Sequence, residues 1–141
     1  MSTNIERYSK DIDKLVTKGR KLKNALISET QPAEFQNILK KEYGEKAKDI
    51  IKALPSFRND YQAWYSEAKS LIKQLLPDRL QDFASYYEKP KSRKALTYES
   101  YRIEDALQGL TVTSGYAKEK VVGPDAAIPH FCQQVAILGV C

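Results

Sequence analysis

The sequence predicts an all-α fold, a compact bundle of about five to seven amphipathic helices in one domain spanning residues 1–141. Apolar residues recur at alternating three and four positions along most of the chain, which is the period of one helix face. Only two short β-branched runs interrupt this pattern. Hydrophobic residues make up 42% of the 141 and charged residues 29%, which is ordinary for a globular domain.

The first helix is expected to begin near Thr3 and to end near Ser28. Thr3 and Glu6 match a capping box, in which each side chain satisfies a free backbone N–H group. Gly19 keeps the register of the apolar stripe, where its missing side chain allows a neighbour to approach closely. The heptad-like spacing is typical of a helix that packs lengthwise on another helix, and the stripe consists of Ile5, Tyr8, Ile12, Leu15, Leu22 and Leu26.

Proline and glycine divide the next segment into two shorter helices. Pro32 restarts the chain, Gly44 ends the first of these helices, and Pro55 ends the second. Their expected inward faces consist of Phe35, Ile38, Leu39 and Tyr43, followed by Ala47, Ile50, Ile51 and Leu54.

A central helix is expected after Ser56, whose hydroxyl suits the N-cap position. Two apolar stripes run along it, so it should contact more than one neighbour. We expect the core to form where this helix meets Ile12, Leu15 and Leu22 of the first. Its contribution to the core is predicted to be Phe57, Tyr61, Trp64, Leu71 and Leu75.

The last third of the chain has weaker signals. A short helix around Phe83 precedes a basic loop, and Thr97 is predicted to cap a helix that carries Tyr101 and Ile103. Residues 111–122 allow a short hairpin, but two strands alone are marginally stable, so a loop is favoured. A final helix is expected after Pro124, with Ile128, Phe131, Cys132, Val135 and Leu138 facing inward.

The residues needed for common catalytic or metal sites are missing. The single histidine, His130, lies about 200° from Cys132 on a helix, so the two do not share a face. One histidine and two late cysteines cannot supply a zinc site, and the scattered glycines form no phosphate-binding loop. We therefore expect no enzyme activity, no metal and no cofactor, with His130 in a structural role.

The net charge of +5 permits an acidic partner without requiring one. The opening residues are charged and amphipathic, unlike a secretory signal, and no apolar run approaches the roughly 20 residues of a membrane span. Cys132 and Cys141 lie close together near the end of the sequence. These features favour a cytoplasmic protein with reduced thiols.

Clusters of cations beside aromatic residues are the one pattern that suggests a ligand. Five cations occupy the outer part of the first helix: Arg7, Lys10, Lys14, Lys18 and Lys21. Four more crowd one loop, and they are the candidate nucleic-acid-binding residues: Lys89, Lys91, Arg93 and Lys94. The tyrosines near this loop, which are able to stack on unpaired bases, are Tyr86, Tyr87, Tyr98 and Tyr101. The alternative is a solvated helix face and a soluble loop.

An apolar last helix suggests a surface for self-association. The candidate interface consists of Ile128, Phe131, Val135 and Leu138, and the first helix is the alternative surface. The chain stops directly after this helix, which we interpret as a docked helix or as the N-terminal part of a longer ancestral protein.

Two segments resemble uncharacterised bacterial proteins that are associated with mobile or accessory DNA. The first runs from Ser56 to Leu80, and the second from Asp125 to Phe131. In those proteins this helical region precedes a second helical domain of HEPN type. HEPN ribonucleases carry an arginine a few residues ahead of a histidine, and Gly123, Pro124 and Asp125 occupy the corresponding positions before His130. The resemblance therefore implies an accessory helical part without the nuclease motif.

Together these patterns favour a non-enzymatic helical interaction module that associates with itself or with another protein. The alternative is an accessory protein that binds nucleic acid weakly and without sequence preference. An unrecognised enzyme or a small-ligand bundle is the third possibility.

Overall fold

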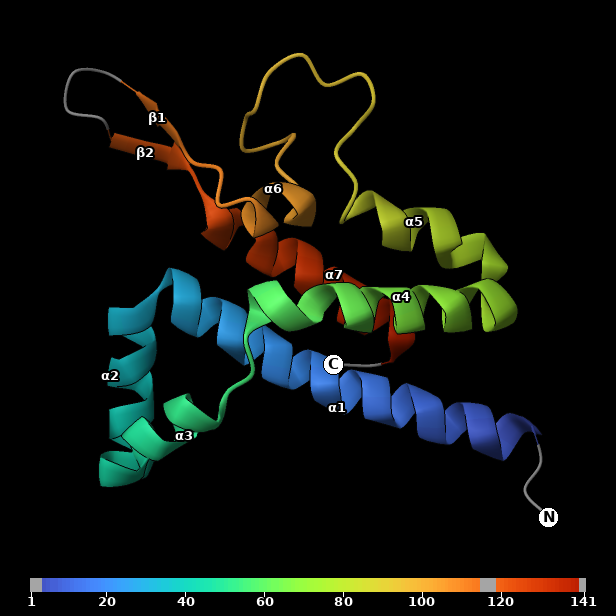
Figure 1. Cartoon of the computed structure of the whole chain (residues 1–141), viewed down its shortest axis with the longest axis horizontal. Coiled ribbons are helices and arrows are strands. Elements are labelled where there is room, and N and C mark those ends of the chain that lie inside the picture. Colours follow the sequence, from blue (N-terminus) through green and yellow to red (C-terminus); the bar gives the residue numbers. More distant parts are fainter. Residues whose placement is uncertain (1–3, 115–118, 140–141) are drawn as a thin grey trace.

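The computed structural model describes residues 4–114 and 119–139, and helices dominate them, as predicted (Figure 1). The longest elements are α1 (Asn4–Thr30) and α4 (Phe57–Leu75). The other helices are α2 (Pro32–Tyr43), η1 (Gly44–Lys46), α3 (Ala47–Ala53), η2 (Pro77–Arg79), α5 (Leu80–Ser85), α6 (Ile103–Leu107), η3 (Pro124–Ala126) and α7 (Ala127–Leu138). A two-stranded antiparallel sheet consists of β1 (Val112–Ser114) and β2 (Glu119–Val122). Thr3 lies outside the described residues, so the capping box predicted there stays a prediction.

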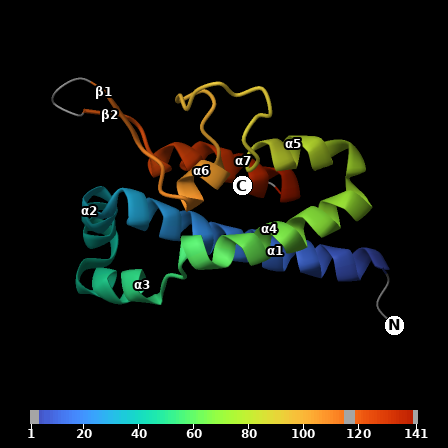
Figure 2. The ribbon, with the colours of Figure 1, turned by 45° about the horizontal axis from the view of Figure 1, so that its top comes forward.

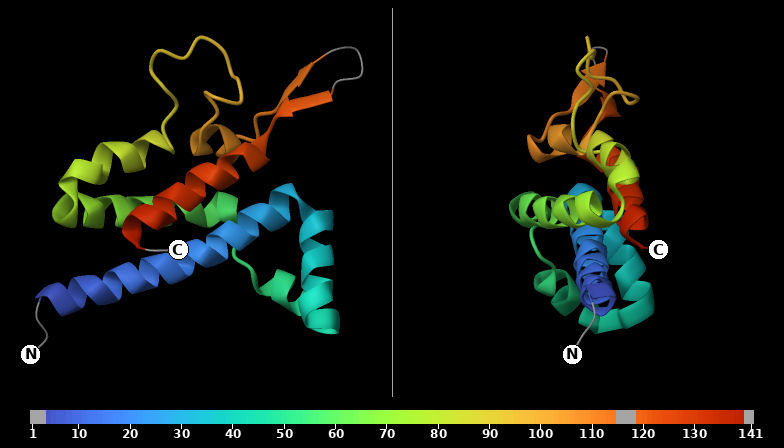
Figure 3. Two further views of the ribbon diagram at one scale, coloured as in Figure 1. Left: turned by 180° about the vertical axis from the view of Figure 1, so that it is seen from behind. Right: turned by 90° about the vertical axis from the view of Figure 1, so that its right-hand side faces the viewer.

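Three helices form the frame of the molecule. α1 and α4 lie side by side and run in opposite directions, and α7 packs against both (Figures 1 and 2). Helix α5 folds back on α4, while α2 and α3 extend from one end of α1 (Figure 3). α4 begins as predicted, because the Ser56 hydroxyl accepts a hydrogen bond from the backbone N–H of Asn59 at 3.2 Å.

Trp64 lies where these three helices meet. Its side chain is fully buried, and Nε1 donates a hydrogen bond to the carbonyl oxygen of Leu15 at 2.8 Å. The ring of Phe131 from α7 packs edge-on against it, with ring centroids 4.9 Å apart. A Cβ atom at Gly19 would lie 3.0 Å from Val135 Cγ2 and 3.3 Å from the Trp64 ring. Gly19 therefore allows the close approach that the sequence predicted.

The predicted core is confirmed. On α4, Phe57, Tyr61, Trp64 and Leu71 are buried, and Leu75 is partly buried against them. On α1 the buried partners are Leu15 and Leu22, with Ile12 partly buried.

A buried glutamine links α7 to the rest of this core. Gln134 Oε1 accepts a hydrogen bond from the Tyr61 hydroxyl at 2.6 Å, and Nε2 donates to the Phe83 carbonyl oxygen at 2.9 Å. The sequence pattern predicted that Cys132, rather than Gln134, faces inward. In the structure Cys132 is only half-buried. Because its amide has both partners, Gln134 is accommodated where an apolar residue was expected.

Helices α2 and α3 share a small core of their own, built on Phe35, Leu39 and Ala47. Gly44 ends α2 with φ of +59°, a conformation that favours glycine, as predicted. The expectation that Ile38 and Tyr43 face inward is wrong, because they are 57% and 51% exposed. The reason is that α2 packs mainly against α1, η1 and α3, so it buries a narrower stripe than predicted.

The helix predicted to start at Thr97 begins instead at Ile103. The Thr97 hydroxyl is engaged locally, since it hydrogen bonds with Ser100 in a turn. The carboxylate of Asp105 accepts a hydrogen bond from the backbone N–H of Arg102 and so caps α6. Tyr101 consequently precedes the helix, where it is fully buried and donates to the Leu110 carbonyl oxygen at 2.7 Å.

Residues 112–114 and 119–122 form a hairpin, so the preference for a loop is wrong. Val112 pairs with Val122, and an irregularity in register follows. Two strands are marginal alone, but here Val122 is 2% exposed and packs with Tyr101 and Ala126. This support comes from residues distant in the sequence, which the local pattern did not reveal.

The position of Trp64 leads to the first prediction. Replacing Trp64→Ala is expected to lower the free energy of unfolding by about 3–5 kcal/mol, because it leaves a cavity and removes the hydrogen bond from the indole to the Leu15 carbonyl oxygen. Urea denaturation followed by circular dichroism measures the change. Ser70→Ala on the exposed side of α4 is the control and should cost less than about 0.5 kcal/mol. A loss below about 1 kcal/mol for Trp64→Ala would contradict the packing described here.

Candidate interaction groove

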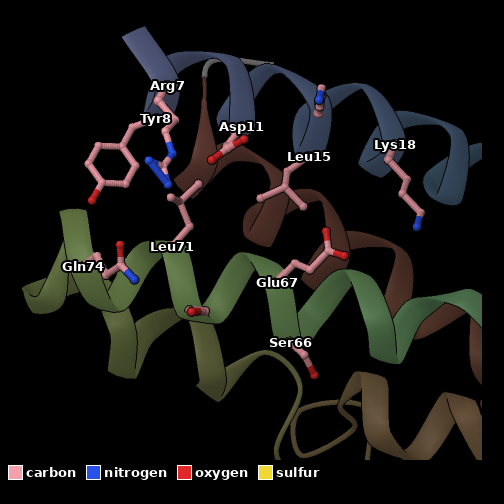
Figure 4. A pocket seen from close by; sticks show the side chains of 11 residues that line it. Arg7, Tyr8, Asp11, Leu15, Lys18, Ser66, Glu67, Leu71 and Gln74 are labelled. Atoms are coloured by element: carbon pink, nitrogen blue, oxygen red, sulfur yellow. The ribbon is translucent and has the colours of Figure 1, made fainter. Parts of the chain in front are cut away.

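A groove runs along the contact between α1 and α4 and has a volume of about 820 Å³. Glu67, Leu71 and Gln74 of α4 point toward α1, whereas Ser66 points away from α1 at the outer edge of the groove (Figure 4). The residues that line this α1/α4 groove are Arg7, Tyr8, Asp11, Lys14, Leu15 and Lys18 from α1, and Ser66, Glu67, Ser70, Leu71 and Gln74 from α4.

The floor of the groove is apolar and its α1 wall is basic. Leu15 and Leu71 point toward each other between the helices and are 6% and 8% exposed. Above them Arg7, Lys14 and Lys18 are exposed along α1, and no ion pair among the described residues involves any of these three cations. With Asp11 on the same side, the α1 wall carries three cations and one carboxylate, a net charge of +2.

The α4 wall is polar and carries one carboxylate, Glu67, and no cation. Ser66, Ser70 and Gln74 are spaced four residues apart, so they lie on one face of the helix. Their hydroxyl and amide groups both donate and accept hydrogen bonds. Two carboxylates, Asp11 and Glu67, also line the groove and limit its positive potential.

The α1/α4 groove and α7 lie on opposite flanks of the α1–α4 contact. Toward α7, Tyr61 and Trp64 pack against the ring of Phe131. Ser66 and Ser70 lie on the far side of α4 from these aromatic rings, because each helical residue advances about 100°. The helix pair thus has one flank filled by a third helix and the other flank open.

A second hollow adjoins the basic side of α1. It shares Lys14 and Lys18 with the α1/α4 groove, and Pro55 from the connection between α3 and α4 forms part of its opposite wall. Lys14 and Lys18 therefore stand on a ridge between two hollows. The other residues that line this second hollow are Asp13, Thr17, Lys21 and Ala53.

The basic loop predicted to bind nucleic acid keeps three of its four cations exposed. Lys89, Lys91 and Lys94 are exposed. Arg93 differs from them, because its Nη1 donates to the Asp105 carboxylate at 2.6 Å and the Asp105 side chain is only 2% exposed. This hydrogen bond raises the pKa of Arg93 above its ordinary value. This pairing gives Arg93 a structural role, and its part in nucleic-acid binding stays a prediction.

Most tyrosines near this loop are unavailable for stacking. Tyr101 is fully buried, and Tyr87 packs on Tyr65 with ring centroids 4.6 Å apart while its hydroxyl accepts a hydrogen bond from Gln62 Nε2. Tyr86 is half-buried, with its ring 5.8 Å from that of His130. Tyr98 differs from them, because it is 63% exposed.

The last helix does not present the apolar face that the sequence suggested. Phe131, Val135 and Leu138 are buried within the chain itself, and Ile128 is partly buried against the same core. Their amphipathic pattern reflects contact with α1 and α4 of the same molecule. The expectation of an exposed apolar interface on α7 is therefore wrong.

His130 lies in a partly buried environment beside Tyr86. Burial lowers the pKa of His130, the positive charge of Arg102 acts in the same direction, and a hydrogen bond with the Tyr101 backbone opposes both. Among residues 4–114 and 119–139, no group of three or more His, Cys, Asp or Glu side chains is arranged to hold a metal ion. The surroundings of His130 are those of a packing residue.

Comparisons with protein-family models, with curated proteins and with solved structures find no match. The resemblance to bacterial proteins that carry a HEPN-type domain therefore stays a prediction. Within the described residues, no helix is long and apolar enough to span a membrane.

The cations of α1 were evident from the sequence, whereas their counterpart on α4 was not. The available signal was Ser66, Ser70 and Gln74, which repeat every four residues on the side of the central helix away from its aromatic stripe. A groove arises only when two such faces meet. The pairing of α1 with α4, rather than the pattern of either helix, creates this groove.

The structural role of Arg93 gives the second prediction. Arg93→Ala is expected to lower the free energy of unfolding by on the order of 2–3 kcal/mol, because it leaves the buried carboxylate of Asp105 without its charged partner. The control is Lys94→Ala, which removes a neighbouring exposed charge and should change stability by less than about 0.5 kcal/mol. Urea denaturation of both variants measures the difference. If the two substitutions lower the free energy of unfolding equally, Arg93 has no structural role and behaves like the exposed cations of the loop.

Proposed function

We propose that this protein is a non-enzymatic helical interaction module that binds a protein partner in the α1/α4 groove. The observation that supports this most directly is the open flank of the α1–α4 pair, which combines an apolar floor with three exposed cations. Two packed helices offer a natural groove for a third, and α7 fills the equivalent groove on the other flank.

The charge of the groove favours an acidic partner. Arg7, Lys14 and Lys18 lie within one stripe of α1, and Lys10 and Lys21 widen this face on the side away from Leu15. Complementary charge speeds encounter and selects among partners more than it adds affinity. An acidic protein segment is therefore the partner that this surface attracts most strongly.

A third prediction tests this binding surface. A fluorescent poly-glutamate peptide of about 20 residues is expected to bind the wild type at low salt and to dissociate as ionic strength rises. The double variant Lys14→Glu with Lys18→Glu should weaken binding by at least about tenfold, equivalent to 1.4 kcal/mol. Fluorescence anisotropy measures both affinities.

The matched control is Lys40→Glu with Lys41→Glu, which changes the net charge equally at exposed positions of α2. This variant should keep most of the affinity. A similar loss in both double variants would show that the peptide senses net charge alone, and the α1/α4 groove would not be the binding surface.

Nucleic-acid binding is a second candidate function, supported by the exposed part of the basic loop. Lys89, Lys91 and Lys94 provide three positive charges within six residues, and the exposed ring of Tyr98 lies in the same connection between α5 and α6. Lysine contacts to phosphate release counterions, and an aromatic ring stacks on an unpaired base. Such binding would be weak, sequence-independent and stronger for single strands than for duplexes.

The fourth prediction follows from these three lysines. A labelled single-stranded oligonucleotide should bind at low salt, and the triple variant Lys89→Ala, Lys91→Ala and Lys94→Ala should abolish most of this binding. Arg93 is left intact so that the fold is preserved. The control removes three exposed lysines elsewhere, by Lys40→Ala, Lys41→Ala and Lys48→Ala. If the wild type does not bind, or if both triple variants bind equally, the loop has no such function.

A further inference from the structure

We infer that the partner in the α1/α4 groove is an α-helix with a narrow apolar ridge, an acidic edge facing α1 and a small, neutral edge facing α4. This inference rests on the proposed function and specifies the partner that the same groove accepts.

The length of the groove fits about three turns of helix. Its α1 wall extends from Arg7 to Lys18, which corresponds to about 17 Å at 1.5 Å per residue. Helix α7, which packs on the opposite flank, has 12 residues and is therefore about as long. An added helix of this length would complete a symmetrical arrangement in which the α1–α4 pair has a third helix on either side.

The floor of the groove admits only a narrow apolar ridge. Leu15 and Leu71 are the apolar side chains at its centre, and the half-buried ring of Tyr8 lies near one end. Apolar residues at three–four spacing along one helix would follow this line of contacts. A broad apolar face would meet the polar side chains of both walls.

The two walls differ in charge, and this difference orients the partner. Carboxylates along one edge of the bound helix would lie beside Arg7, Lys14 and Lys18, which outnumber the one carboxylate of this wall, Asp11. The other edge would lie beside Ser66, Ser70 and the Glu67 carboxylate, where a second row of acidic residues would be repelled. Small or amide side chains therefore suit the α4 side.

The carboxylates of the groove also favour a helix over nucleic acid. A phosphate backbone carries negative charge along its whole length. It would therefore meet Asp11 and Glu67 as well as the cations. A helix places its charges on one edge, so with its acidic edge against α1 it meets Asp11 among three cations but keeps its charges away from Glu67.

A second copy of this chain does not suit the groove through a symmetric contact. In a two-fold dimer the same surface is used on both subunits. The positive face of α1, from Arg7 to Lys21, would then lie against its own copy. Like charges opposed in this way destabilise an interface, so we expect a partner of a different sequence.

Two peptides of about 18 residues, with identical composition, test the inference. In the patterned peptide, leucines recur at three–four spacing, glutamates follow one edge, and Ala, Ser and Gln fill the remainder. The shuffled peptide contains the same residues without any helical stripe. At moderate salt, fluorescence anisotropy should show the patterned peptide binding at least about tenfold more tightly.

Two kinds of variant locate the binding. Ser70→Trp places a large side chain in the groove and should abolish the preference for the patterned peptide, whereas Ser9→Trp, at an exposed position of α1 outside the groove, should not. The double variant Lys14→Glu with Lys18→Glu should lower the affinity for the patterned peptide more than the control double variant Lys40→Glu with Lys41→Glu does. Circular dichroism verifies that each variant is folded, and Ser66→Trp replaces Ser70→Trp if the latter does not fold.

The possible outcomes separate this inference from the proposed function. If both peptides bind equally well and Lys14→Glu with Lys18→Glu weakens both, the inference of a helical partner is overturned. The proposed function, binding of an acidic protein segment, would still stand. Binding of neither peptide, together with no binding of poly-glutamate, would overturn both. If a single-stranded oligonucleotide binds more tightly than the patterned peptide, and Ser70→Trp blocks that binding, nucleic acid is the occupant of the groove. This result would also overturn the inference.

Discussion

The indole of Trp64 fixes the distances between the three main helices. Its N–H group donates to the Leu15 carbonyl oxygen of α1, and its ring packs against Phe131 of α7. Gly19 completes this arrangement, because any larger residue would press on both the indole and Val135. The same spacing brings Leu15 of α1 and Leu71 of α4 together at the floor of the α1/α4 groove. The proposed binding surface therefore depends on a buried contact on the other flank of the same helix pair.

The long helices and their core were predictable because their signals are local. The stripes of α1 and α4 repeat at the helical period, and Ser56 and Gly44 mark helix ends through chemistry that acts within a few residues. The errors arose where distant residues decide the structure. The hairpin depends on packing of Val122 against Tyr101, and α6 begins where Asp105 caps it rather than at Thr97.

The candidate site was only partly predictable for a related reason. An exposed cation and a paired cation look alike in a sequence, so Arg93 was grouped with its neighbours although Asp105, 12 residues later, binds it. Likewise, the apolar stripe of α7 has the same pattern whether it is covered by its own chain or by a partner. The cations of α1 were correctly placed on an outer face. Their position beside Ser66 and Ser70 follows from tertiary packing, which no local pattern records.

The hydrogen bonds of Gln134 have a consequence for how the molecule unfolds. If α7 detached from an otherwise intact bundle, the Tyr61 hydroxyl and the Phe83 carbonyl group would lose their shared partner, and the aromatic cluster around Trp64 would be open to water. Partial opening at this end of the chain is therefore costly compared with fraying of an ordinary terminal helix. Amide hydrogens of α7 should consequently exchange with solvent through the same global opening that exposes α1 and α4, so the last helix belongs to one cooperative unit with the first.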